Sequence, residues 1–222
     1  MEKIILGFFI CSVAIATQIV DAQGTTFLSN LEQPSTGSDA VASDSWLAIA
    51  FGSGNNAGGY TLNSVQLGMT DASGNPNNLM VTLYQHYNGA NLLTSNLGSL
   101  NGSSDPATGG VYVFSPASNL TLSANAFYLV VLTAGTAVVN GAYELSLAGA
   151  SFYNPSGGWT VGDMGPLFSS LNGSSWNLIS GNPQFSINAT AVPEPSTLGL
   201  LTLGGLLLGW RWRKSSRFFF EQ

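Results

Sequence analysis

Short blocks of apolar or alternating residues, each about as long as a β-strand, recur through the middle of this chain between clusters of Gly, Asn, Pro and Ser. Leu79, Val81 and Leu83 fall on one face of such a strand, and residues 127–132 are apolar on both faces, as in a central strand. No long amphipathic helix competes with these blocks. We therefore predict an all-β, antiparallel β-sandwich or jelly-roll ectodomain over residues 23–191. The blocks are residues 46–51, 60–67, 79–84, 111–114, 127–132, 143–147 and 185–187.

The turns between these blocks include four Asn-Gly dipeptides, which begin at Asn88, Asn101, Asn140 and Asn172. This dipeptide tolerates the positive φ angles that tight hairpin turns require. About 170 residues are enough for one domain with a sizeable core. We therefore expect a single ectodomain whose strands are joined by short turns.

Charge is scarce in this chain, where charged residues make up 7% of the sequence against about 25% in an average protein. Residues 4–210 contain no Lys or Arg, whereas residues 23–191 contain seven acids, so the ectodomain has a formal charge of 0 − 7 = −7. Proteins neutralise nucleic-acid phosphates with Lys and Arg. This composition therefore excludes nucleic acid as a partner.

The N-terminus has the pattern of a secretory signal peptide over residues 1–22. Lys3 precedes a mostly apolar run over residues 4–19, and Ala22 suits the position before a signal peptidase cut. We expect a signal helix that signal peptidase removes after Ala22. The alternative is an uncleaved anchor, but the run is shorter than the ~20 residues of a spanning helix. Removing the signal peptide also removes Cys11, the only cysteine, so the exported chain cannot form a disulfide.

The C-terminus has three parts in order. Pro193, Glu194 and Pro195 come first, an apolar run of 14 residues follows at 197–210, and a basic cluster of Arg211, Arg213 and Lys214 ends it. At ~1.5 Å per residue the run reaches about 21 Å, short for a bilayer, although flanking Trp and Arg side chains suit the interface. We predict a short C-terminal transmembrane helix with the basic residues as its membrane stop. Residues 218–222 form a tail without an assigned role.

Residues 192–217 closely resemble the PEP-CTERM sorting signal of Gram-negative bacteria, a tail that is also labelled the C-terminal domain of ice-binding proteins. The resemblance implies that exosortase recognises Pro193, Glu194 and Pro195, cleaves nearby and passes the ectodomain to the cell surface or the medium. The protein would then be anchored in the inner membrane only transiently. It further implies a bacterium that makes exopolysaccharide or biofilm. An ordinary single-pass anchor that is never cut is the alternative.

The ectodomain also resembles the choice-of-anchor type R domain over about residues 26–148. The matching blocks are residues 27–31, 46–54, 60–67, 120–122 and 128–131. These are mostly core positions, so the resemblance implies a fold and a location at the cell surface. It implies no chemistry.

No residue is predicted to be catalytic, and we expect the protein not to be an enzyme. The motif Gly-x-Gly-x-x-Ala at residues 52–57 lacks the following helix that a dinucleotide site needs, so it is interpreted as a loop. His86, the only histidine, is interpreted as a residue at a strand end. No Gly-x-Ser-x-Gly motif occurs. A pair of carboxylates that hydrolyses a glycoside is the remaining enzymatic alternative.

Two kinds of binding site are weighed. Residues 71–77 carry oxygen-bearing side chains at alternate positions, but Asp71 is their only carboxylate, so a polar loop is favoured over a calcium site and no cofactor is expected. Trp159 and Trp176 lie in Gly/Ser-rich segments and are the candidate glycan contacts. We predict an exported surface or matrix protein that is structural or associates with exopolysaccharide. The alternatives are a secreted glycan-active hydrolase and a surface adhesin or ice-binding protein.

Overall fold

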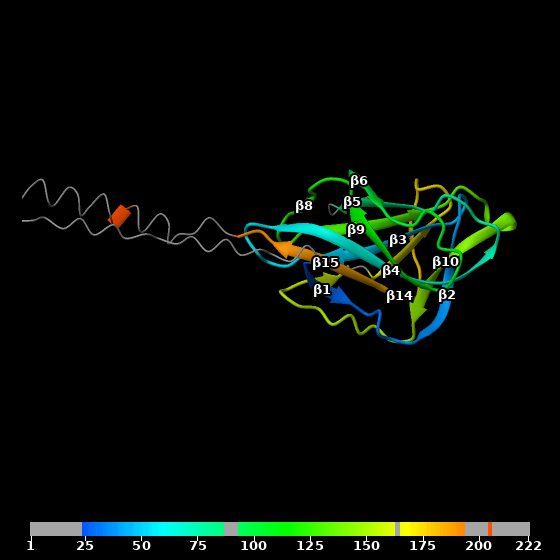
Figure 1. Ribbon diagram of the computed structural model, residues 1–222, viewed down its shortest axis with the longest axis horizontal. Coiled ribbons are helices and arrows are strands. Elements are labelled where there is room, and N and C mark those ends of the chain that lie inside the picture. Colours follow the sequence, from blue (N-terminus) through cyan, green and yellow to red (C-terminus); the bar gives the residue numbers. More distant parts are fainter. Residues whose placement is uncertain (1–23, 87–92, 163–164, 194–203, 206–222) are drawn as a thin grey trace, which may run out of the picture.

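The computed structural model describes residues 24–86, 93–162, 165–193 and 204–205. The described residues between 24 and 193 form one curled antiparallel sheet (Figure 1). The predicted signal helix lies outside the described residues, as does the predicted transmembrane helix apart from residues 204–205. The all-β, antiparallel prediction is confirmed for the part of the chain that the structure describes.

Fifteen strands and one 3-10 helix make up the described fold. In chain order they are β1 (Thr25–Ser29), β2 (Ser35–Val41), β3 (Trp46–Gly52), β4 (Tyr60–Gly74), β5 (Met80–His86), β6 (Ser95–Asn101), β7 (Gly110–Pro116), β8 (Thr121–Leu122), β9 (Phe127–Thr133), η1 (Val138–Asn140), β10 (Gly141–Ala148), β11 (Thr160–Val161), β12 (Leu167–Ser170), β13 (Asn177–Leu178), β14 (Asn182–Pro183) and β15 (Phe185–Ala191).

The strands follow the order β1-β15-β4-β7-β6-β5-β9-β3-β12-β13, and β10 pairs with β4, β2 and β14. The link between β6 and β7 is short, because only Leu100 with Pro116 and Asn101 with Ser115 are paired. This link divides the sheet into a β4 half (β1, β15, β4, β7, β8, β10, β2 and β14) and a β9 half (β6, β5, β9, β3, β11, β12 and β13). The two layers are therefore halves of one curled sheet, and the jelly-roll assignment stays a prediction.

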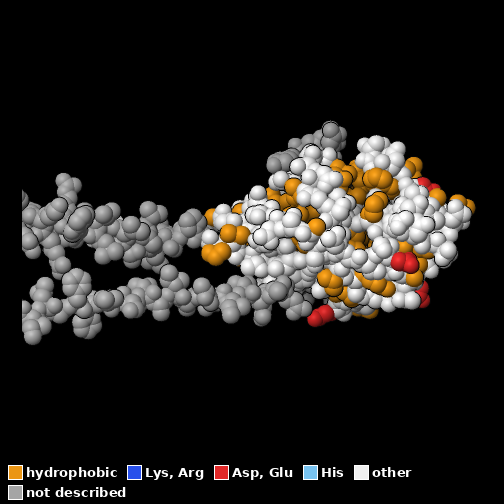
Figure 2. Space-filling view, turned by 45° about the horizontal axis from the view of Figure 1, so that its top comes forward, with side chains coloured by type: hydrophobic (Ala, Val, Ile, Leu, Met, Phe, Trp, Pro, Cys, Tyr) orange, Lys and Arg blue, Asp and Glu red, His pale blue; other side chains and the backbone are white. Residues whose placement is uncertain are grey.

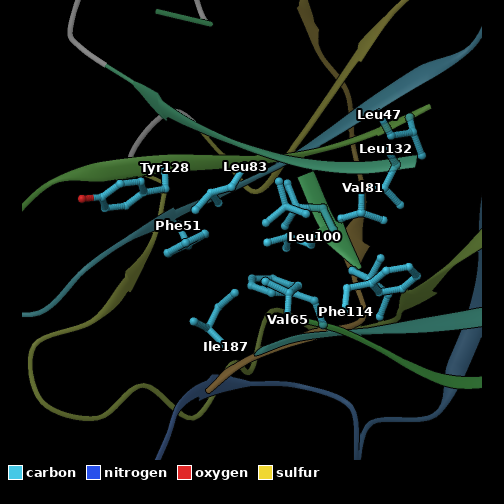
Figure 3. Packing of buried hydrophobic residues seen from close by; sticks show 14 of the residues in the cluster. Leu47, Phe51, Val65, Val81, Leu83, Leu100, Phe114, Tyr128, Leu132 and Ile187 are labelled. Atoms are coloured by element: carbon cyan, nitrogen blue, oxygen red, sulfur yellow. The ribbon is translucent and has the colours of Figure 1, made fainter. Parts of the chain in front are cut away.

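The core lies between the two halves. In Figure 3, Leu83 and Val81 from β5 face Val65 from β4 and Ile187 from β15. All four side chains are at most 1% exposed. Burying an aliphatic side chain of this size contributes about 1.5–3 kcal/mol. With no cysteine outside residues 1–22, burial and sheet hydrogen bonds hold the fold together.

The predicted strand blocks all fall on strands of the structure. β9 lies between β5 and β3, as expected for a segment that is apolar on both faces. The alternation around β5 is also confirmed, because Leu79, Val81 and Leu83 are buried while Met80 is 56% exposed. A strand with one buried and one open face needs this period of two.

The Asn-Gly dipeptides do not form two-residue hairpins where the structure describes them. Asn101 ends β6, and the next strand begins only at Gly110. Asn140 ends η1, which joins two strands that do not pair with each other, β9 and β10. Asn172 lies in the longer loop between the paired strands β12 and β13. The dipeptide at Asn88 lies outside the described residues.

Candidate functional site

The last strand before the predicted sorting segment is held on both sides. β15 pairs with β1, where Thr25 lies opposite Ala189, and with β4, where Tyr60 lies opposite Ala191. The first strand of the ectodomain therefore runs beside the last one. This pairing fixes the position at which the chain leaves the domain.

Hydrogen bonds to the loop before β4 extend this hold by one residue beyond β15. The side-chain amide of Asn56 donates to the carbonyl oxygens of Gly59 (2.6 Å) and Val192 (2.9 Å). The backbone N–H of Val192 donates to the carbonyl oxygen of Gly59 at 3.0 Å. Gly59 has φ = +76°, a conformation that favours glycine. We call Asn56, Gly59 and Val192 the exit clamp.

The exit clamp gives the Gly-rich segment at residues 52–57 a structural role. Gly52 still belongs to β3, and from Ser53 the segment is a loop, as predicted, that runs into β4 without a helix. Its Asn56 ties the end of the domain to the start of the sorting segment. Sequence reasoning missed this role because Asn56 and Val192 are 136 positions apart.

The Pro-Glu-Pro tripeptide of the sorting segment begins directly after the exit clamp. Pro193 is exposed and follows Val192 without a linker. Glu194 and Pro195 lie outside the described residues, as do the predicted membrane stop (Arg211, Arg213 and Lys214) and Ala22. Among the residues that the structure describes, no helix has the length and apolar character needed to cross a bilayer.

Comparison with known proteins identifies this segment. Residues 191–214 match the family described as the PEP-CTERM protein-sorting motif. No curated protein and no solved structure matches the chain. The motif indicates an exported protein of the cell surface, and the described part of this protein is all-β. More particularly, the motif implies processing by exosortase.

The resemblance of the ectodomain to the choice-of-anchor type R domain has no counterpart in these matches. The matched family covers the segment from the end of β15 to the basic cluster. The matched segment therefore says nothing about the activity of the ectodomain.

Trp159 does not lie on the surface, which corrects its assignment as a glycan contact. It is 1% exposed and stacks on Phe27 and Phe51, with ring centroids 5.1 and 5.9 Å away. Gly157 and Gly158 have positive φ angles, and this turn folds the indole into the core instead of exposing it. The glycines around a tryptophan here indicate a tight turn and not an open platform.

Trp176 lies on the outer face of the β9 half and is half-buried. Its indole N–H donates to the carbonyl oxygen of Gly173 at 3.1 Å. Trp46 is also half-buried on this face, and its N–H donates to the carbonyl oxygen of Ser43. Trp176 thus remains a candidate glycan contact with part of its ring accessible. The buried residues under the two rings are Ala48, Ala50, Leu129, Val131 and Phe168.

Asp71 lies in the last part of β4 and not in a loop, which corrects the predicted loop at residues 71–77 for its first four positions. Its Oδ1 accepts a 2.7 Å hydrogen bond from the backbone N–H of Gly109. Within the described ranges, no three His, Cys, Asp or Glu side chains gather as a metal site would require. The expectation that no cofactor is bound, with a calcium site as the less favoured alternative, stays a prediction.

Asp39 and Glu144 are two carboxylates on neighbouring strands, β2 and β10. Asp39 pairs with Leu145, and Glu144 pairs with Ala40. Because side chains alternate along a strand, the two carboxylates project to opposite faces of the sheet. Burial, and secondarily the charge of Glu144, raises the pKa of Asp39. This pair is not placed to flank a glycosidic bond, which requires both carboxyl groups around one substrate.

A polar pocket of about 430 Å³ opens on the outer face of the β4 half. Its lining comes from β1, β15 and β4, from the turn that follows β1, and from Asn154 in the segment between β10 and β11. Sequence analysis assigns none of these residues to a binding site, because they are mostly polar residues from separate segments of the ectodomain. The residues are Thr26, Ser29, Asn30, Leu31, Glu32, Gln33, Gln66, Asn154 and Ser186.

Proposed function

We propose that this protein is exported through its signal peptide, is held in the inner membrane by residues 197–214 until exosortase acts, and then serves at the cell surface as a structural or exopolysaccharide-associating protein. The observation that carries the proposal is the PEP-CTERM motif directly after the last paired strand. The motif accounts for export and sorting. The ectodomain is then the part that works outside the cell.

Two features of the ectodomain support an association with exopolysaccharide. Its hydrogen-bonding side chains are mostly uncharged, and no Lys or Arg occurs between residues 4 and 210. On the face shown in Figure 2, a few Asp and Glu side chains are scattered among uncharged groups. The half-buried Trp176 adds an aromatic surface of the kind on which sugar rings stack.

Sorting is tested by following the native protein in membrane, surface and medium fractions of cells with and without exosortase. We expect a shorter form at the surface or in the medium in the presence of the enzyme, and a longer membrane form in its absence. A variant with Pro193, Glu194 and Pro195 changed to Ala should behave as in the strain without exosortase. Pro155→Ala, which changes an exposed proline away from the motif, is the matched control.

If the protein has the same size and location in both strains, the sorting part of the proposal is contradicted. Association with the matrix is measured separately, by co-sedimentation of the surface form with exopolysaccharide isolated from the same cells. Protein that stays entirely in the supernatant contradicts association, whereas sorting is unaffected by that result.

A further inference from the structure

The floor of the polar pocket is a row of three side chains across the β4 half. Ser29 of β1 lies opposite Ser186 of β15, and Ser186 lies opposite Gln66 of β4. Residues that are directly paired across antiparallel strands project to the same face. Here that face is the outer one, because the neighbouring residues Leu28, Ile187 and Leu67 are fully buried in the core. The row therefore offers two hydroxyls and one amide outward.

One wall of the pocket is the turn after β1, and it is held rigidly. Asn30 is 1% exposed, and its side chain donates to the carbonyl oxygen of Pro183 and accepts from the N–H of Phe185, both at 2.9 Å. Gln184 donates from its side chain to the carbonyl oxygen of Gln33 at 2.5 Å. These bonds fix both ends of the turn that carries Leu31 and Glu32. The pocket is thus formed before any ligand arrives, which lowers the entropic cost of binding.

Two groups in the floor have unused hydrogen-bonding capacity. Ser186 is only 2% exposed, yet its hydroxyl makes no hydrogen bond within the described residues. The side-chain amide of Gln66 makes none there either. The Ser186 hydroxyl, in the middle of the row, is not among the buried atoms that lack a partner and lines the pocket, so a ligand that both donates and accepts can bond to it.

Charge and polarity narrow the ligand class. Glu32 is the one ionisable side chain of the lining, and the domain contains no cation to balance it, so an anionic ligand is repelled. An apolar ligand would leave the floor unsatisfied. Small-molecule sites range over about 300–1,000 Å³, and this pocket has room for a sugar unit.

We propose that the pocket over Ser29, Ser186 and Gln66 binds an uncharged sugar unit of a polysaccharide. Sugar hydroxyls would donate to Glu32 and accept from the amide of Gln66, and would exchange hydrogen bonds with Ser186. The inference rests on the proposed association with exopolysaccharide and gives it a place and a ligand class.

The test is affinity electrophoresis of the surface form in gels that contain dextran, galactomannan, or the anionic polymer alginate, followed by calorimetry with oligosaccharides of the retarding polymer. We expect retardation by at least one uncharged polymer and none by alginate. Gln66→Ala should weaken binding about five- to tenfold, the loss of roughly one hydrogen bond. Ser186→Val, which fills the floor with an apolar group, should abolish it. Gln85→Ala, at a half-buried glutamine of β5 outside the pocket, is the matched control.

Urea unfolding of each variant separates lost binding from lost folding. If Ser186→Val does not fold, Gln66→Ala still decides the result. Retardation by alginate alone, or by no polymer, overturns the inference. Equal affinity of wild type and Gln66→Ala overturns it too, whereas the proposed function stands if both still co-sediment with native exopolysaccharide.

Discussion

The side-chain amide of Asn56 donates a 2.9 Å hydrogen bond to the carbonyl oxygen of Val192, the residue directly before Pro193 of the Pro-Glu-Pro tripeptide. With the bond from the N–H of Val192 to Gly59, it ties the exit of the chain to the loop before β4. The motif therefore starts at a fixed point on the domain and not at the end of a flexible linker. Exosortase must meet the motif close to the folded surface.

Replacing Asn56 with Ala should loosen the exit clamp. Two partly buried hydrogen bonds are lost, and the carbonyl of Val192 loses its side-chain partner. We expect the free energy of unfolding to fall by about 1–3 kcal/mol, measured by urea titration. Asn55→Ala, at the exposed neighbouring position, should change it by less than about 0.5 kcal/mol. Equal effects of the two substitutions would show that the clamp bonds add no stability.

The exit clamp also limits where a protease can cut the folded substrate. Residues 185–191 are paired with β4, and Val192 is hydrogen bonded to Gly59, so none of them can enter a protease cleft unless the strand detaches. The new C-terminus of the surface form should therefore lie at residue 193 or beyond. Intact-mass spectrometry of the surface form measures it. A C-terminus within residues 185–192 would mean that β15 detaches before cleavage.

Trp159 should be a major contributor to stability. Its ring stacks on Phe27 and Phe51 and meets Tyr60 edge-on, with centroids 5.0 Å apart. Trp159→Ala should lower the free energy of unfolding by about 3–5 kcal/mol. Trp159→Phe should cost less, because its indole N–H has no hydrogen-bond partner among the described residues. Trp176→Ala, at a half-buried ring, should also cost less than Trp159→Ala, and an equal cost would contradict this ranking.

The absence of Lys and Arg between residues 4 and 210 predicts the result of digestion. Trypsin cuts after Lys and Arg, so even the urea-unfolded ectodomain should survive it in one piece. Chymotrypsin, which cuts after aromatic residues, should fragment the same sample and so confirm that it is unfolded. Tryptic peptides from inside this span would show that the protein made differs from the translated sequence.

Sequence patterns located the strands that bury apolar residues but not those that are polar. β3, β5 and β9 coincide with predicted blocks because their hydrophobic pattern comes from the core they face. β2 has the sequence STGSDAV and is mostly exposed. It is a strand because β10 pairs with it. A local sequence pattern does not predict pairing with a strand about 100 residues away.

The candidate sites also differ in whether the sequence alone could predict them. The sorting motif was identified from sequence because it works as a contiguous segment, and residues 191–214 match it. Trp159 was misplaced because the glycines beside it were interpreted as a sign of exposure. The polar pocket joins Ser29, Gln66 and Ser186 through strand pairing, so it becomes visible only when the register is known.

Asp39 should make the protein less stable as the pH rises. Burial, with a smaller contribution from Glu144, raises its pKa above the ordinary value of 3.8, and its Oδ2 has no hydrogen-bond partner among the described residues. The folded state therefore holds this proton more tightly than the unfolded chain. The stabilising contribution is complete below the unfolded pKa, falls as the pH rises through 3.8 to the raised pKa, and is constant above it.

Asp39→Asn cannot ionise, so its free energy of unfolding relative to wild type should increase across that pH window. Urea titrations from about pH 3 to about pH 7 measure the difference. Glu144→Gln keeps the acceptor for the hydroxyl of Ser38 but removes the neighbouring charge. This substitution should make the loss of stability with rising pH smaller without abolishing it, because burial is the larger cause of the raised pKa of Asp39. Parallel curves for wild type and Asp39→Asn would show that folding does not perturb this carboxyl group.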